Sequence, residues 1–499
     1  MFEFAVFYAK ISHISELMKS GKSQQALVCL DTMVKQGAFA VEEYWAVLSL
    51  YGTCFYDLND LEKMMEYQWA SIQSTQGQPL RIQQENYSDY LMVQHYLAGI
   101  SDEEWRQKCF SYNRLYRDTV QFTHSWSKHC HKKLRIGYLT AAMAENIGSY
   151  FAIQLFSAYD HSRYEVYCYG VREKDDALTD QIRNYVKKVT IFPKGVLMHD
   201  AAQAIYQDEI DILFDMDVHN GGGRTLMIAG YKPAPVQIGG IGYMSTSGLQ
   251  AMDYFLGDIY CDPPGLNEAD FSEELLRLPN SHLCYTPTER VLRCQRSYQR
   301  HGGIRFASFN KFFKITDEML LAWWEILQRV PESHLLLKNA VHHYNALSVM
   351  HKRLLSAGFR EDQFTLEDAS VDYLERYADV DILLDTYPYT GGGTTCEALY
   401  RGVPVVSRYG RRHGERFGYS LLENTGLGEL ACPDIKTYIQ TAVALAQDEN
   451  LLRALHQHIP EMMQHSPVMD GPEYVQGIER LYEEIWSKWI DRQKEKEGK

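Results

Sequence analysis

The chain of 499 residues is long enough to form several hydrophobic cores, and its composition excludes several classes of protein. Hydrophobic residues make up 45% and charged residues 23%, which excludes a disordered or fibrous chain. The formal net charge of −15 argues against a nucleic-acid-binding protein, because such proteins usually present a basic face to the phosphates.

The sequence predicts a cytoplasmic protein. No apolar run approaches the roughly 18 residues of a membrane-spanning helix, and the first residues lack the basic start and cleavage site of a signal peptide. Ten cysteines are scattered without a CxxC pair, which indicates reduced thiols. His129 and His131 flank Cys130, but alternate side chains of a strand or loop point apart, so we expect no metal site.

Residues 1–125 are expected to be wholly helical. Four apolar residues follow one helical face: Ala26, Leu27, Leu30 and Met33. Gly21 and Asn59 occupy matching positions in two similar segments, which resembles the helix pairs of tetratricopeptide repeats. Their offset exceeds the usual period of about 34 residues, so a short degenerate array and a plain helical bundle both remain open. Either would serve as a scaffold or a partner-facing module.

Residues 133–285 change to an alternation of short strands and amphipathic helices. The expected strands are rich in β-branched and aromatic residues: LRIGYLT, YEVYCYGV, KKVTIFP, DILFDMD and VQIGGIGY. This alternation is typical of a parallel sheet with crossover helices. DILFDMD is apolar on both faces, which favours a buried strand.

A second unit follows a polar, basic linker at residues 286–303 and covers residues 304–470. Its expected elements are IRFASFN, the helix DEMLLAWWEILQRV, HLLLKN, FTLED, DILLDTYP and VPVVSR. Residues beyond 435 are expected to be helical, and residues 471–499 form a C-terminal helix with a charged tail. The chain is therefore predicted to be an all-α region followed by two facing nucleotide-binding α/β domains.

The most specific motif lies in residues 381–407, where an expected buried strand ends at Asp385. Glycines, threonines and an acid follow it: Gly391, Gly392, Gly393, Thr394, Thr395 and Glu397. Glycines let the backbone approach a ligand, and the threonines are expected to start a helix whose free N–H groups attract an anion such as a diphosphate. Glu397, one turn further, is placed to accept hydrogen bonds from ribose hydroxyls. An ordinary tight connection is the alternative interpretation.

This segment resembles the catalytic half of the protein O-GlcNAc transferase family (glycosyltransferase family 41), most closely its SPINDLY-type branch. Similar segments are FASFNKFFKITDEMLLAWWEILQRVPESHLLLK, KPAPVQIGGIGYMSTSG, LPNSHLCYTP and SPVMDGPEYVQGIERLYEEIW. The likeness runs in unbroken order from residue 133 to about residue 490. It implies a GT-B fold of two Rossmann-like domains, with the nucleotide sugar held mainly by the second. It also implies no metal and no cofactor besides the donor substrate.

The resemblance gives Lys314 the central role. In FNKFFKIT it occupies the position of an essential lysine that contacts the donor diphosphate, where it would neutralise charge that grows on the leaving nucleotide. Asn310 and Lys311 match further donor-contacting positions. For an arbitrary lysine, a solvated surface position would be the ordinary interpretation.

In the first α/β unit, the resemblance selects His219 and Tyr243. His219 lies in DMDVHNGGGR, which is similar to a strand-end loop of the family, and is expected to face the cleft and bond the acceptor or a donor phosphate. A satisfied loop histidine is the alternative. Tyr243 belongs to GYMSTSG, similar to a loop on the acceptor side, although Met244 replaces the usual proline.

Two positions depart from the family pattern. Asn146 stands where many relatives have a histidine proposed as the base, and an amide cannot take a proton at neutral pH. The base is then another group, such as His219 or a donor phosphate oxygen, or the activity is altered. Tyr373 stands where relatives often place a histidine against the nucleotide base, and it keeps a face for stacking.

The activity implied is transfer of a sugar, by family default GlcNAc from UDP-GlcNAc, to Ser/Thr hydroxyls of intracellular proteins. The helical region would present the protein acceptors. Three alternatives stay open: a GDP-fucose-dependent protein O-fucosyltransferase, a transferase for small or glycan acceptors, and a degenerate member that only binds a partner protein.

Overall fold

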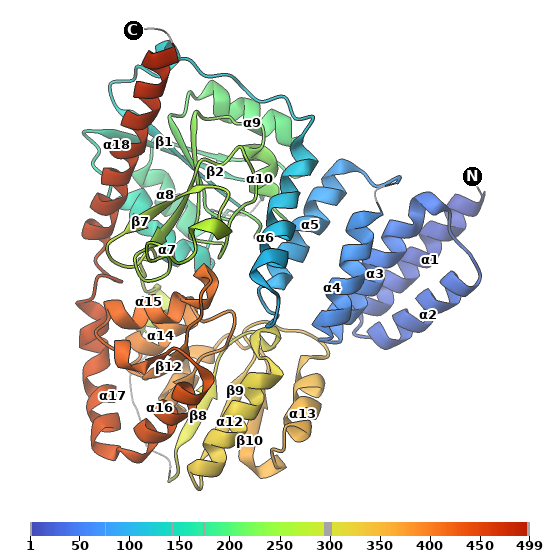
Figure 1. Ribbon diagram of the computed structural model, residues 1–499, viewed down its shortest axis with the longest axis vertical. Helices are drawn as coiled ribbons and strands as arrows, with labels where there is room; N and C mark the ends of the chain where they lie inside the picture. Colours follow the sequence, from blue (N-terminus) through green and yellow to red (C-terminus); the bar gives the residue numbers. More distant parts are fainter. Residues whose placement is uncertain (1, 75, 142, 173–174, 294–301, 497–499) are drawn as a thin grey trace.

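A computed structural model describes residues 2–74, 76–141, 143–172, 175–293 and 302–496. Figure 1 shows a helical region on one side of two stacked α/β parts, with the chain entering through the helices. The predicted linker at 286–303 lies partly outside the described residues, as does Cys294. Among the residues that the structure describes, no helix has the length and apolar character needed to cross a membrane.

The N-terminal region is helical, as predicted. Its helices are α1 (Phe2–Lys19), α2 (Ser23–Lys35), α3 (Tyr44–Asp57), α4 (Leu61–Gln73), α5 (Leu80–Gln94) and α6 (Asp102–Ser111). The four stripe residues of α2 are all buried. Gly21 and Asn59, with φ of 75° and 57°, make the tight turns between α1 and α2 and between α3 and α4. This repeated hairpin agrees with a tetratricopeptide-like region.

The first α/β part contains a parallel sheet with the strand order β3-β2-β1-β4-β5-β6-β7 in the described residues. Its strands are β1 (Leu134–Thr140), β2 (Tyr164–Gly170), β3 (Lys188–Ile191), β4 (Ile212–Asp215), β5 (Val236–Gly239), β6 (Tyr254–Asp258) and β7 (Glu274–Leu278). The helices are α7 (Ile147–Ser157), α8 (Ala177–Tyr185), α9 (Met198–Gln207) and α10 (Arg224–Ala229). The first five strands were predicted from the sequence, whereas β6 and β7 were not.

The second part repeats this plan with the strand order β10-β9-β8-β11-β12-β13, again with parallel pairs. Its strands are β8 (Arg305–Ser308), β9 (His334–Lys338), β10 (Phe364–Glu367), β11 (Ile382–Leu384), β12 (Val405–Arg408) and β13 (Ala431–Cys432). The helices are α11 (Glu289–Arg293), α12 (Asp317–Arg329), α13 (Ala346–Ser356), α14 (Gly393–Tyr400), α15 (Phe417–Asn424), α16 (Ile435–Gln447) and α17 (Glu449–Gln464). Two Rossmann-like domains after a helical region confirm the predicted fold class.

The two domains share an internal repeat that the sequence analysis missed. Residues 211–225 read DILFDMDVHNGGGRT, and residues 381–395 read DILLDTYPYTGGGTT. The first aspartate of each copy anchors the neighbouring strand in the same way. Asp211 accepts a hydrogen bond from the Arg135 amide at 2.8 Å, and Asp381 accepts one from the Arg305 amide at 2.7 Å. Both copies therefore place a polar, glycine-rich loop at the carboxyl edge of a central strand.

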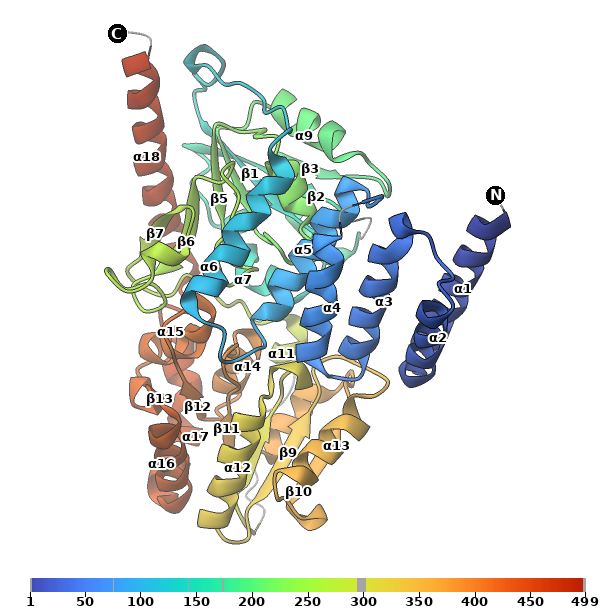
Figure 2. The ribbon, with the colours of Figure 1, turned by 45° about the vertical axis from the view of Figure 1, so that its right-hand side comes forward.

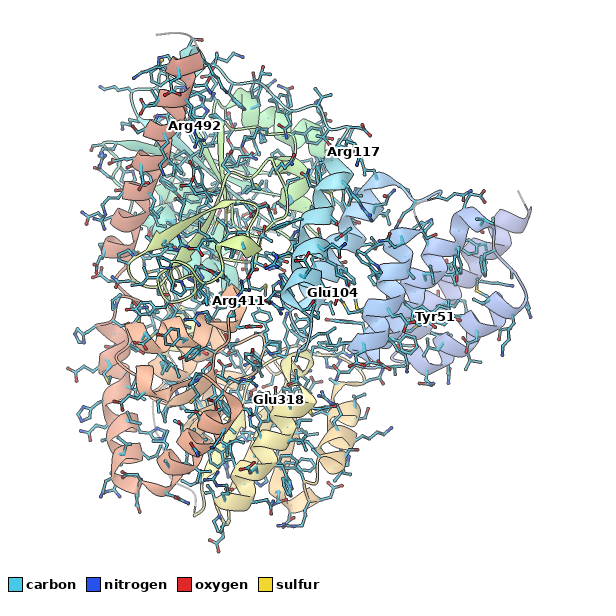
Figure 3. All side chains as sticks on the ribbon, viewed as in Figure 1. Tyr51, Glu104, Arg117, Glu318, Arg411 and Arg492 are labelled. Carbon is cyan, nitrogen blue, oxygen red and sulfur yellow. The ribbon has the colours of Figure 1, made fainter. Side chains whose placement is uncertain are left out.

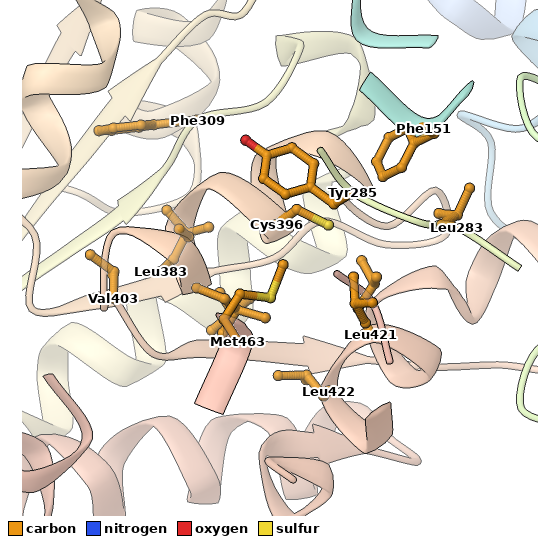
Figure 4. Packing of buried hydrophobic residues seen from close by; sticks show 14 of the residues in the cluster. Phe151, Leu283, Tyr285, Phe309, Leu383, Cys396, Val403, Leu421, Leu422 and Met463 are labelled. Carbon is orange, nitrogen blue, oxygen red and sulfur yellow. The ribbon is translucent and has the colours of Figure 1, made fainter. Parts of the chain in front are cut away.

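A long C-terminal helix, α18 (Gly471–Lys496), ties the two domains together. Figure 1 shows it leaving the second domain and running along the first. Its Tyr482 hydroxyl lies 3.0 Å from that of Tyr138 in β1, and Glu479 accepts the amide hydrogen of Asp160 at 2.7 Å. One hydrophobic cluster also crosses the boundary: Figure 4 shows Phe151 of the first domain near Cys396 of the second.

Helices α5 and α6 pack on the α/β core, whereas α1–α4 extend away from it in Figure 2, except at the end of α3, where Tyr56 stacks on Phe313 of the second domain at a centroid distance of 4.4 Å. Trp105 of α6 donates a hydrogen bond to Ser245 at 3.4 Å, and Arg106 pairs with Asp270 at 3.2 Å. A Cβ at Gly248 would come within 2.0 Å of the Cys109 carbonyl oxygen, so the backbones touch there. The helical region therefore shares its interior with the first domain.

Candidate active site

A cavity of about 250 Å³ lies between the carboxyl edges of the two sheets. The first domain contributes Thr140, Asn146, Ser149, Asp217, Asn220 and Gly242 to its wall, and the second contributes Asn310, Lys311, Lys314, Tyr389, Gly392, Gly393 and Thr394. Helix α5 adds Met92. Ligands of open α/β sheets bind at this edge, where loops follow the strands.

Lys314 is held at the cavity by a short helical turn, Phe312–Lys314, that follows β8. Its Nζ donates to the carbonyl of Thr390 at 3.3 Å and lies 3.5 Å from the centre of the Tyr389 ring. Desolvation and the nearby charge of Lys311 lower the pKa of Lys314 to about 7, against the opposing effect of Asp385. An anion in the cavity would favour the charged form, so Lys314 suits a ligand with negative charge.

The glycine loop is fixed from behind by a buried carboxylate. Asp385 accepts hydrogen bonds from the Gly391 amide at 2.8 Å and from the Ser407 hydroxyl at 2.7 Å. Helix α14 then begins at Gly393, with Gly392 at the N-cap position. The two threonines lie in the first turn of this helix, as expected, although neither is its N-cap: Thr395 is buried, and its hydroxyl donates to the Gly391 carbonyl at 3.1 Å. Gly392, Gly393 and Thr394 nevertheless line the cavity with the free N–H groups of the first turn.

Asn310 and Lys311 line the same wall. The buried Nδ2 group of Asn310 has no hydrogen-bond partner among the described residues, and it is therefore available to a ligand. Burial lowers the pKa of Lys311. Two cations, an unused amide and a helix N-terminus thus converge on one side of the cavity.

Tyr373 and Glu397 are in contact with each other but do not line this cavity. Glu397 is buried, and its two carboxylate oxygens accept the hydroxyls of Tyr373 and Tyr377. Desolvation raises the pKa of Glu397 to about 7, and the two tyrosine hydrogen bonds act in the opposite direction. The hydroxyls of the two tyrosines therefore occupy the Glu397 carboxylate in this structure, and Thr394 lies between Glu397 and the cavity.

The expectation that His219 faces the cleft is wrong. Its ring is completely buried below α5, with Nδ1 3.0 Å from the Ser88 hydroxyl and Nε2 2.9 Å from the Ser247 carbonyl oxygen. Since a carbonyl only accepts, Nε2 carries the hydrogen and Nδ1 accepts from Ser88. Desolvation lowers the pKa of His219 to about 3. No pattern in the sequence indicates that a helix preceding the domain covers this loop.

Tyr243 does not line the cavity either, against the expectation. Its ring is buried and meets those of His219 and His95 edge-on, at centroid distances of 5.0 and 5.2 Å. Only the preceding residue, Gly242, lines the cavity. Tyr243 thus belongs to the packing between the helical region and the first domain.

Asn146 does lie at the cavity. Its side chain begins α7: Oδ1 accepts the Ser149 amide hydrogen at 3.2 Å, and Nδ2 donates to the Ala144 carbonyl at 2.7 Å. These two hydrogen bonds make the Asn146 side-chain amide the N-cap of α7. Among the described residues of the first domain, Asp217 is the carboxylate that lines the cavity, and it was not predicted from the sequence. The sequence feature that could have identified Asp217 is its position two residues after a buried strand, in DILFDMD.

The side chains of His129 and His131 converge, although the sequence predicted that they point apart. Both Nδ1 atoms lie within hydrogen-bond distance of Asp211, at 2.8 Å for His129 and 2.9 Å for His131. The three groups are close enough to hold a metal ion, as are Asp258, Cys261 and His282. Within the described part of the chain, neither group lines the cavity.

Ion pairs connect the helical region, the first domain and the second domain where the three meet. Arg411, labelled in Figure 3, lies where the two domains and α6 meet, and it contacts Asp270 at 2.6 Å and Asp102 at 3.1 Å. Arg412 also pairs with Asp102, at 2.9 Å. The helical region, the first domain and the second domain thus share one ion-pair network.

Comparison with known proteins agrees with this architecture. A structure of a mutant of the O-GlcNAc transferase from Thermobaculum terrenum superimposes with a TM-score of 0.82, covering 99% of both chains at 24% identity. At this identity the likeness shows the fold: two Rossmann-like domains of the GT-B type behind a helical region.

Sequence relatives cover most of the chain. It is 33% identical over 418 residues to the probable UDP-N-acetylglucosamine–peptide N-acetylglucosaminyltransferase SPINDLY of Solanum lycopersicum, and 34% identical over 419 residues to that of Arabidopsis thaliana. These matches cover 80% of this chain and 44% of each relative, so the chain spans less than half of their length. The model for "Glycosyl transferase family 41" matches residues 99–286 and 285–478. The chain therefore belongs to glycosyl transferase family 41, with SPINDLY-type proteins among its relatives.

Proposed function

We propose that this chain transfers a sugar from a nucleotide-sugar donor to serine or threonine hydroxyls of proteins, with UDP-GlcNAc as the donor. The observation that carries the proposal is the convergence of Lys314, Asn310 and the N-terminus of α14 on a cavity between two Rossmann-like domains. The plant relatives are named for transfer of N-acetylglucosamine from its UDP derivative to peptides, which favours this donor.

The donor diphosphate would lie against Gly392, Gly393 and Thr394, where backbone N–H groups and the helix dipole attract anions. Lys314 would approach it from β8 and stabilise the charge that develops as the bond to the sugar breaks. Lys311 adds a second positive charge. These groups take the place of a metal ion in neutralising the diphosphate, so we propose that transfer needs none.

The nucleoside would extend toward a second groove between the domains, of about 830 Å³. Ser149 lines both spaces, and Arg290, Asp372 and Tyr150 line the groove. Tyr373 lies beside it, with its ring 5.2 Å from the Arg290 guanidinium. Rotation of Tyr373 away from Glu397 would offer its face to a base and free the carboxylate for ribose hydroxyls.

We propose that proteins are the acceptors and that helices α1–α4, which project from the core, help to position them (Figure 2). The cysteines within the described residues are free thiols, most of them buried, which supports a reducing compartment such as the cytoplasm.

The test is a donor screen with the purified chain, which compares thermal shifts with UDP-GlcNAc, GDP-fucose and the corresponding nucleotides in the presence of EDTA. A ligand at 100 times its dissociation constant stabilises a protein by about 2.7 kcal/mol. Transfer of labelled GlcNAc to a protein extract should then follow. A shift with GDP-fucose alone would assign the other donor, and tight protein binding without any transfer would support a degenerate member.

A further inference from the structure

Asp217 is the one carboxylate among the described residues that line the cavity. It follows β4 closely and belongs to the loop that repeats the glycine loop of the second domain. Its Oδ2 accepts hydrogen bonds from the Thr140 hydroxyl, at 2.6 Å, and from the Ala141 amide. In the described part of the chain no donor approaches Oδ1. One oxygen therefore holds the carboxylate in place, and the other is available to a ligand in the cavity.

Sugar transfer to a hydroxyl requires a group that accepts the hydroxyl proton. The Asn146 side chain is an amide that caps α7, and an amide cannot take a proton at neutral pH. His219 is outside the cavity, and both of its ring nitrogens are occupied. Lys311 and Lys314 belong to the wall on which the diphosphate would lie. Asp217 lies in the opposite wall, which the first domain provides, together with Asn146 and Ser149.

We propose that Asp217 is the general base of this enzyme. This inference rests on the proposed function. The acceptor oxygen forms a bond to the anomeric carbon, and its proton passes to Oδ1 of Asp217. The bond between that carbon and the phosphate oxygen breaks, and its electron pair stays on the nucleoside diphosphate beside Lys314. The products are the glycoside, the nucleoside diphosphate and a protonated Asp217.

The surroundings of Asp217 increase its affinity for a proton. Burial raises its pKa, while the Thr140 and Ala141 hydrogen bonds and the charge of Arg172 act in the opposite direction. The neighbouring acid on the same loop, Asp215, is buried, accepts the Asp217 and Val218 amide hydrogens through Oδ1, and is not among the described residues that line the cavity. Lys311 and Lys314 face Asp217 from the second domain. A raised pKa makes a carboxylate a better proton acceptor.

The decisive variant is Asp217→Asn. Asparagine can still accept the Thr140 and Ala141 hydrogens through its own Oδ1, so the loop should keep its shape. We expect the transfer rate to fall about 10²–10⁴-fold, the range that general base catalysis supplies, while affinity for UDP-GlcNAc changes less than threefold. The matched control is Asp200→Asn, the same change at an exposed position on α9, which should transfer at the wild-type rate.

The pH–rate profile separates a base from a structural residue. The wild-type rate should fall below the pKa of Asp217, and the residual rate of Asp217→Asn should lose this acidic limb; Asp217→Glu should restore part of the rate and the limb. An Asp217→Asn protein that binds UDP-GlcNAc normally and transfers at more than a tenth of the wild-type rate would overturn the inference. A wild-type protein that transfers from no UDP or GDP sugar would overturn the proposed function instead. If Asp217→Asn binds no donor, its role is structural and the inference also fails.

Discussion

Substitution of Lys314 by methionine tests the electrostatic account of the cavity. Methionine keeps most of the length and packing of lysine but removes the charge. Loss of one preorganised group that stabilises a transition state costs about 10²–10³-fold in rate, or about 2.7–4 kcal/mol. We therefore expect Lys314→Met to transfer at that reduced rate while its thermal midpoint stays within a few degrees of the wild type.

The pKa of Lys314 adds a pH dependence to donor binding. With a pKa of about 7 in the empty cavity, Lys314 is mostly charged at pH 6, and about a tenth of the molecules carry the charge at pH 8. Because only the charged form suits the diphosphate, the apparent affinity should fall about tenfold from pH 6 to pH 8. UDP-GlcNAc is the suitable ligand, because its diphosphate lacks the terminal phosphate ionisation near pH 6.

Calorimetric titration at both pH values is the assay. Lys314→Met should bind weakly at both pH values, with the pH dependence largely removed. Lys311→Met, which removes the other lysine of the cavity, should keep a pH dependence that is shifted to higher pH, because the Lys311 charge lowers the pKa of Lys314. A folded Lys314→Met protein with wild-type affinity, wild-type pH dependence and wild-type transfer would refute the assignment of this wall to the diphosphate.

Three further predictions follow from the contacts of the helical region and the cavity. His219→Ala should lower the free energy of unfolding by roughly 2–4 kcal/mol in denaturant unfolding, since it removes a buried ring and leaves the Ser247 carbonyl unpaired, while Ser88 keeps its Tyr112 contact. Transfer per folded molecule should stay within threefold, and a 100-fold loss in a fully folded protein would show that His219 is catalytic. Removal of residues 1–125 should prevent cooperative unfolding, because α5 and α6 carry part of the core, and a truncated protein with a sharp thermal transition and intact UDP binding would contradict this. EDTA should leave donor affinity and transfer unchanged, whereas activity that disappears with EDTA and returns with magnesium or manganese would show that the lysines do not suffice.

The sequence predicted the parts of the fold that have strong local patterns. Apolar strands such as DILLDTYP and the helix DEMLLAWWEILQRV carry periodicity that depends only on neighbours in the chain. The short β13 and the strands β6 and β7 were missed because their residues are mixed in character and their burial comes from the neighbouring strands. Lys314 and Thr394 were predicted from a motif, and both line the cavity.

The error at His219 has one physical cause, the position of α5. This helix precedes the first domain in the chain but covers the loop that carries His219, and the Ser88 hydroxyl lies where a Cβ on Gly223 would be. The equivalent glycine loop of the second domain is uncovered and lines the cavity. Two similar segments thus have different roles, which only tertiary contacts can determine.

The most direct measurement is the position of the donor diphosphate in a crystal structure of the wild-type chain with UDP-GlcNAc, grown with EDTA. We expect phosphate oxygens within hydrogen-bond distance of Lys314 Nζ and of the amides at Gly393 and Thr394. The sugar should lie between the diphosphate and Asp217. A diphosphate bound elsewhere on the chain, or one that reaches this cavity only through a metal ion, would contradict this expectation.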